Sequence, residues 1–86
     1  MNINDLNDTI KKKISEQLII DEILIEDKTY LHLKHKNFQK NKFHIKIFIK
    51  SKELSNMSKI NSTKKIYDIL KLEIKNYIHS IQIILK

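Results

Sequence analysis

The sequence contains no cysteine, no glycine and no proline. Without cysteine, the chain can form no disulfide and has no thiol chemistry of its own. Without glycine, it has no glycine-rich loop of the kind that cradles phosphates in nucleotide-binding enzymes. The longest apolar runs, for example residues 18–20 and 83–85, are three residues long, whereas a transmembrane helix needs roughly 20 apolar residues. These absences exclude thiol catalysis, phosphate binding by a glycine loop and a transmembrane helix.

The 86 residues correspond to a single domain, residues 1–86, with a small core. The net charge is +7, and all seventeen basic residues are lysine. Isoleucine, lysine and asparagine together make up half of the chain. Because their codons are AT-rich, codon bias is a sufficient source of the charge, which is therefore weak evidence for a nucleic-acid partner.

No targeting segment is recognisable at the start of the chain. Asp5, Asp8 and the lack of a long apolar stretch near Met1 argue against a signal peptide, and no arginine-rich transit segment is present. We therefore expect a soluble, cytoplasmic protein with no membrane contact. A mitochondrial location would require a presequence that has been removed.

The N-terminal half has the apolar spacing of a helix followed by a strand. Asn2 or Asn4 can cap the helix, and spacings of three and four define its apolar face, which consists of Ile3, Leu6, Ile10 and Ile14. Residues 18–33 are β-like, and the residues that share one face are Ile23, Ile25, Leu31 and Leu33. The polar residues 34–42 are expected to form a loop.

The C-terminal half begins with the clearest strand, in which apolar and mostly polar residues alternate from 43 to 50. Residues 51–58 are expected to be irregular. The next segment has helical spacing, on Ile66, Ile69, Leu70, Ile74 and Tyr77. Residues 78–85 predict a last strand with Ile81 and Ile83 on one face. The predicted order is helix, strand, strand, helix, strand: an α+β fold with a three-stranded mixed sheet, antiparallel then parallel, covered on one face by helices.

Four segments resemble motifs of the BolA family in the same order. Residues 44–51 (His-Ile-Lys-Ile-Phe-Ile-Lys-Ser) resemble its H-F-x-V-x-I-V-S strand, and residues 66–74 (Ile-Tyr-Asp-Ile-Leu-Lys-Leu-Glu-Ile) resemble its V-Y-x-x-L-x-x-E-L helix. Residues 78–81 (Ile-His-Ser-Ile) are similar to its I-H-A-L, and residues 29–32 (Thr-Tyr-Leu-His) to its S-Y-x-H. Two departures stand out: Leu-Ser-Asn at 54–56 replaces the usual F-x-G, and Ser-Thr-Lys at 62–64 replaces R-H-R.

The resemblance implies a fold like the second class of KH domains, in agreement with the predicted element order. It also implies a non-enzymatic protein that is a monomer alone and pairs with a monothiol glutaredoxin. The pair would share a bridging [2Fe–2S] cluster for cluster assembly, transfer or iron sensing. The glutaredoxin and glutathione would each supply a thiolate, and no cluster is expected in the isolated protein.

The resemblance also implies the metal ligands on this side of the cluster. The histidine of I-H-A-L corresponds to His79, and the second ligand comes from the loop between the first two strands. Because the chain has no cysteine, that ligand would be a histidine: His32 matches best, with His35 close behind. His44 faces away from the apolar residues of its strand, and we expect it to be structural or surface-facing.

The remaining candidate residues can also be explained by packing or by surface charge alone. Tyr67 and Tyr77 are expected to pack on the core. A partner-binding face is predicted around the start of the second helix. Its residues are Lys50, Lys52, Lys64 and Lys65. A charged surface with no further role is equally compatible with these lysines.

Two other classes of function have weaker support in the sequence. A nucleic-acid-binding regulator could use the lysine-rich surface, but without the Gly-x-x-Gly loop by which KH domains hold RNA and without arginine for guanine. An enzyme has little support, because the sequence offers no cysteine nucleophile and no paired carboxylates.

Overall fold

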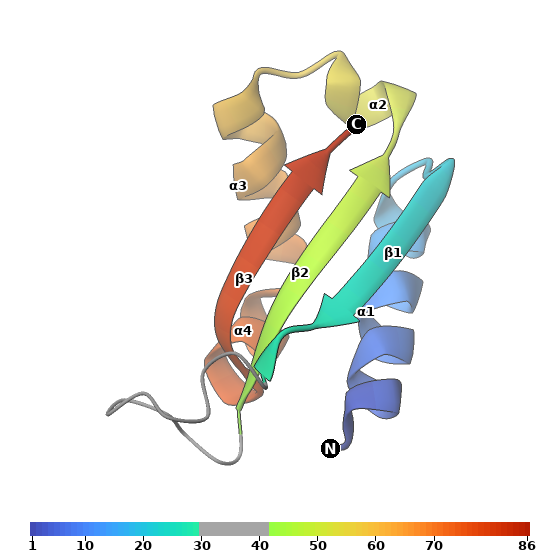
Figure 1. Cartoon of the computed structure of the whole chain (residues 1–86). Coiled ribbons are helices and arrows are strands. Elements are labelled where there is room, and N and C mark those ends of the chain that lie inside the picture. Colours follow the sequence, from blue (N-terminus) through green and yellow to red (C-terminus); the bar gives the residue numbers. More distant parts are fainter. Residues whose placement is uncertain (30–41) are drawn as a thin grey trace.

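The computed structural model describes residues 1–29 and 42–86. In chain order the elements are α1 (Ile3–Gln17), β1 (Glu22–Asp27), β2 (Phe43–Lys50), α2 (Lys52–Ser55), α3 (Lys59–Ile69), α4 (Lys71–Asn76) and β3 (Ile78–Leu85). The sheet order is β1-β2-β3, with β1 antiparallel and β3 parallel to the central β2. The helices lie on one face of this sheet and leave the other open (Figure 1). The predicted α+β class, mixed sheet and one-sided helical layer are therefore confirmed.

Helix α1 begins where the sequence predicts. The side-chain Oδ1 of Asn2 accepts the N–H of Asp5 at 2.8 Å, which satisfies one of the free donors at the helix start. Leu6, Ile10 and Ile14 recur on one face, and all three are fully buried. This face packs the helix against the sheet, whose strand β1 contributes the buried Ile25 to the same core.

Strand β2 runs through the middle of the core. Ile45, Ile47 and Ile49 alternate along it and are at most 3% exposed, because they face the helices. Each of the other two strands pairs with β2 over most of its length. The predicted alternation of this strand is therefore confirmed.

The open face of the sheet carries one apolar row. Leu24, Phe48 and Ile84 are paired across β1, β2 and β3. The ammonium groups of Lys46 and Lys86 lie 5.0 and 5.3 Å from the centroid of the Phe48 ring, so the row is partly covered by cation–π contacts.

The segment between β2 and β3 differs from the sequence-based expectation in two places. Residues 51–58, expected to be irregular, include the short helix α2, which begins because Ser51 Oγ accepts the N–H of Leu54 at 3.2 Å. The single helix expected over 66–77 is divided into α3 and α4. At the division, Leu70 has φ −98° and ψ 16°, outside the helical range, although its buried side chain still fills the core.

The expected face of residues 31 and 33, together with most of the expected loop at 34–42, lies outside the described residues. In the described ranges, no helix is long and apolar enough to cross a membrane.

Candidate functional site

The start of β3 breaks the regular alternation of a strand. Ile78 is buried on the helix side, and Ile81, Ile83 and Leu85 pack partly buried against the same core. His79 and Ser80, which lie between Ile78 and Ile81, are both exposed, so two outward residues follow one another. The register shows the cause: Phe43 pairs with Ile78, but the next residue of β2, His44, pairs with Ser80. His79 is the extra residue of this register shift, as in a β-bulge, and the shift turns its side chain out of the core.

His44 is buried and hydrogen-bonded at this end of the sheet. Its residue is 5% exposed, although it lies on the face of β2 opposite the apolar residues. Its backbone N–H donates to Thr29 Oγ1 at 3.1 Å, and its carbonyl accepts the N–H of Lys28 at 2.7 Å. Its ring Nδ1 is hydrogen-bonded to Ser80 Oγ at 2.6 Å. His44 was expected to be structural or surface-facing, and the structure shows the first of these two alternatives, a buried structural histidine.

His79 is exposed, and its ring lies against that of His44. The two ring centroids are 4.8 Å apart, with the planes tilted by 54°. An exposed imidazole presents a ring nitrogen to an external metal, whereas the buried His44 can act on such a metal only through its neighbours. Of the two histidines, His79 is therefore the one that is exposed to another molecule.

The other predicted ligands, His32 and His35, lie outside the described residues. The chain enters and leaves their segment at Thr29 and Lys42, which follow β1 and precede β2. Asp27 pairs with Ile45, so both junctions are at the His79 end of the sheet. Within the described residues, no group of three or more histidine, cysteine, aspartate or glutamate side chains could hold a metal ion by itself.

The predicted partner lysines do not gather around His79. Lys50 ends β2 and Lys52 begins α2, at the end of the sheet opposite to the start of β3. Lys64 and Lys65 lie half-way along α3. All four are exposed. They are available to a partner, but Lys50 and Lys52 form a surface separate from the histidine pair, and a partner role for these lysines stays a prediction.

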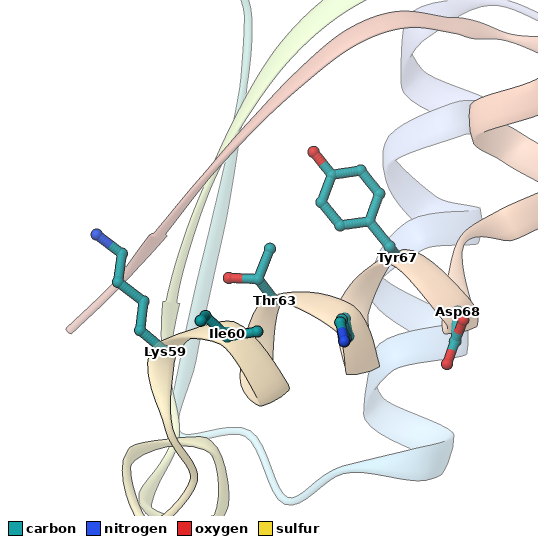
Figure 2. A pocket seen from close by; sticks show the side chains of 6 residues that line it. Lys59, Ile60, Thr63, Tyr67 and Asp68 are labelled. Carbon is teal, nitrogen blue, oxygen red and sulfur yellow. The ribbon is translucent and has the colours of Figure 1, made fainter.

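A shallow hollow runs along the outer side of α3, and Thr63 and Tyr67 project from the same side of the helix there (Figure 2). Ile60 is 69% exposed and Tyr67 is 40% exposed. Packing on the core was expected for both tyrosines, and it holds only for Tyr77, which is partly buried against the core. Tyr67 instead contributes to a surface distinct from the histidine pair.

The family model for BolA-like proteins matches residues 14–86. The chain belongs to the BolA family. Among curated proteins, it is similar to the UV-induced protein uvi31 of Schizosaccharomyces pombe (strain 972 / ATCC 24843). The two are 32% identical over 80 residues, an alignment that covers 88% of this chain and 78% of the relative.

Solved BolA structures have the same fold as this BolA chain. The BolA domain of SufE1 from Arabidopsis thaliana superposes with a TM-score of 0.78 at 26% identity, covering 100% of this chain and 93% of that domain. BolA1 from Arabidopsis thaliana has a TM-score of 0.75 at 24% identity, covering 92% and 87%. At 24% identity, the similarity to BolA1 is evidence for the fold alone. As a family, BolA-like proteins work with glutaredoxins in iron–sulfur biology and are generally non-enzymatic.

The contact between His44 and Ser80 could not be predicted from local sequence patterns. These residues are 36 positions apart, and only the pairing of β2 with β3 brings them together. One signal was present: serine occupies position 80, where the BolA motif I-H-A-L has alanine. That difference introduces a hydroxyl beside the predicted ligand His79.

Proposed function

We propose that this BolA-like chain is a non-enzymatic iron–sulfur adaptor. It binds a monothiol glutaredoxin and shares with it a bridging [2Fe–2S] cluster, for which His79 is the ligand on this side. The observation that carries the proposal is the register shift at the start of β3. It turns His79 out of the core and leaves its imidazole exposed at the end of the sheet.

The chemistry of the available donors supports a shared cluster. A neutral imidazole can replace a thiolate on one iron, as in Rieske centres. This chain has no cysteine, so its own donors are histidines, and the thiolates must come from the glutaredoxin and glutathione. The cluster would thus be bound at the contact between two proteins, which fits an exposed ligand better than a buried one.

The second ligand would come from the segment between β1 and β2. Both junctions of that segment are at the His79 end of the sheet. His32 and His35 follow Thr29 closely in the sequence, so we expect either of them to reach the same partner as His79. His32 is the first candidate because it matches the family motif, and His35 is the second.

The test is anaerobic reconstitution of the protein with a monothiol glutaredoxin, glutathione, iron and sulfide, followed by visible circular dichroism and size-exclusion chromatography. We expect a heterodimer whose cluster spectrum differs from that of the glutaredoxin alone. His79→Ala should restore the glutaredoxin spectrum, and His32→Ala and His35→Ala, made separately, identify the second ligand. Gln82→Ala, an exposed change on the same strand, is the matched control.

The proposal is overturned if the wild-type protein forms no complex and leaves the glutaredoxin spectrum unchanged. The lysine surface then supports a second candidate function, nucleic-acid binding, because the exposed Lys50 and Lys52 lie apart from the histidine pair. Contacts between lysine and phosphate release counterions. That function therefore requires an affinity for duplex DNA that falls steeply as salt is raised.

A further inference from the structure

Ser80 Oγ and His44 Nδ1 lie 2.6 Å apart, and the ring of His44 packs against the exposed ring of His79. This hydrogen bond joins Ser80, one of the two outward residues at the start of β3, to the central strand β2. It does not enter the proposed ligand set, since Ser80 and His44 are not placed as ligands. Its effect on the site must therefore pass through His79.

Apart from its contact with His79, His44 is hydrogen-bonded to three residues on its two sides. Thr29 and Lys28 bind its backbone from the β1 side, and Ser80 binds its ring from the β3 side. With 5% exposure, the ring has little room to change rotamer. It therefore presents a fixed surface to whatever packs against it.

His79 lacks comparable restraint from burial. Its side chain is exposed, and its backbone lies in the register shift rather than in a regular pair. An exposed imidazole ordinarily samples several staggered rotamers. The contact with the His44 ring at 4.8 Å between centroids favours the rotamers in which the two rings pack.

We propose that Ser80 and His44 are positioning residues for His79. Ser80 fixes the ring of His44, and that ring holds the His79 imidazole in the orientation from which it binds a cluster. This inference rests on the proposed function. Groups behind a metal ligand commonly change metal affinity by about 10–100-fold. Because the contact to His79 is ring packing rather than a hydrogen bond, we expect an effect of about tenfold, the lower end of that range.

The first test uses the isolated protein and needs no cluster. Imidazole ring resonances are recorded by long-range proton–nitrogen correlation for wild type, Ser80→Ala, Ser80→Thr and the control Gln82→Ala. Ser80→Ala should shift the ring resonances of both His44 and His79. Ser80→Thr keeps the hydroxyl and should leave them near the wild-type positions. The proposal is overturned if Ser80→Ala moves only His44, because the two rings are then not coupled.

The second test measures cluster retention in the heterodimer with glutaredoxin. Ser80→Ala should release its cluster to a chelator about tenfold faster than wild type, with Ser80→Thr restoring the slow rate. The affinity of the cluster-free proteins for each other and the far-ultraviolet spectrum should not change, which separates positioning from misfolding. Equal release rates for wild type and Ser80→Ala contradict the proposal.

The two tests distinguish the failures. If wild type forms no cluster with glutaredoxin, the proposed function fails, and the role of Ser80 in cluster retention fails with it. If wild type forms the cluster but Ser80→Ala changes neither the His79 ring nor the release rate, only the positioning role fails.

Discussion

The ammonium group of Lys13 lies 2.7 Å from Oε2 of Glu73 and joins α1 to α4. The side chain of Glu73 is only 6% exposed, whereas that of Lys13 is 33% exposed. The other carboxylate oxygen, Oε1, is buried without a hydrogen-bond partner among the described residues. The lysine is therefore the main compensation for a carboxylate that is almost removed from water.

Lys13→Met should lower the free energy of unfolding by about 2–3 kcal/mol, because it leaves the Glu73 carboxylate buried without its cation. Urea unfolding followed by circular dichroism measures the change. Lys28→Met is the control, since the Lys28–Glu26 pair is more exposed at its carboxylate and 3.2 Å long; it should cost no more than about 0.5 kcal/mol. Combining Lys13→Met with Glu73→Leu should recover most of the loss. Equal losses of unfolding free energy in Lys13→Met and Lys28→Met would mean that the burial of Glu73 does not strengthen its ion pair.

Ser51 connects the start of α2 to the segment between α1 and β1. Its Oγ accepts the N–H of Leu54 at 3.2 Å and donates to the carbonyl of Ile19 at 2.7 Å, and the residue is 3% exposed. Ser51→Ala should therefore cost about 2 kcal/mol, the upper end for loss of a helix cap. Ser58→Ala removes a cap that only accepts from Asn61 and should cost about 1 kcal/mol. Urea midpoints compare the two variants, and a larger loss for Ser58→Ala would show that the bond to Ile19 adds nothing.

The layers of the fold could be predicted from the sequence, because the apolar residues of each helix and strand recur at a regular local spacing. The buried Leu6, Ile10 and Ile14 follow a helical spacing, and the inward residues of β2 follow a period of two. The parallel pairing of β2 with β3 then follows from the helical connection between them. These features need no knowledge of distant contacts.

The features that the sequence did not predict depend on contacts between distant segments. The extra residue at His79 exists only in the pairing of β3 with β2, and the buried His44 is hydrogen-bonded to Thr29 on one side and Ser80 on the other. The ion pair between Lys13 and Glu73 spans 60 positions. His79 is a predicted metal ligand because of a family motif. The structure adds its exposure and its neighbours, which cannot be derived from the spacing of apolar residues.

The two faces of the sheet should respond differently to truncation. Ile47→Ala removes a fully buried side chain between sheet and helices and should cost about 3–4 kcal/mol. Leu24→Ala removes a side chain that is 56% exposed on the open face and should cost about 0.5 kcal/mol. Urea unfolding of both variants measures this difference. A cost for Leu24→Ala close to that of Ile47→Ala would mean that the open face is covered in solution, for example by a second copy of the chain.

The last prediction concerns how far the glutaredoxin contact extends from His79. Lys50 and Lys52 lie at the opposite end of β2, about 20 Å away at roughly 3.3 Å per strand residue. If the partner is centred on His79, Lys50→Gln with Lys52→Gln should leave the cluster spectrum and the heterodimer affinity within about twofold of wild type. Such distant charges act mainly on the association rate at low salt.

The matched control is Lys11→Gln with Lys12→Gln, which removes the same charge from exposed positions on α1. Calorimetry gives the affinity and stopped-flow mixing gives the association rate for both double variants. Similar small effects would assign these lysines to general charge. A loss of affinity of tenfold or more, confined to Lys50→Gln with Lys52→Gln, would instead show that the glutaredoxin covers the full length of β2, and the predicted lysine face would then belong to the same interface as His79.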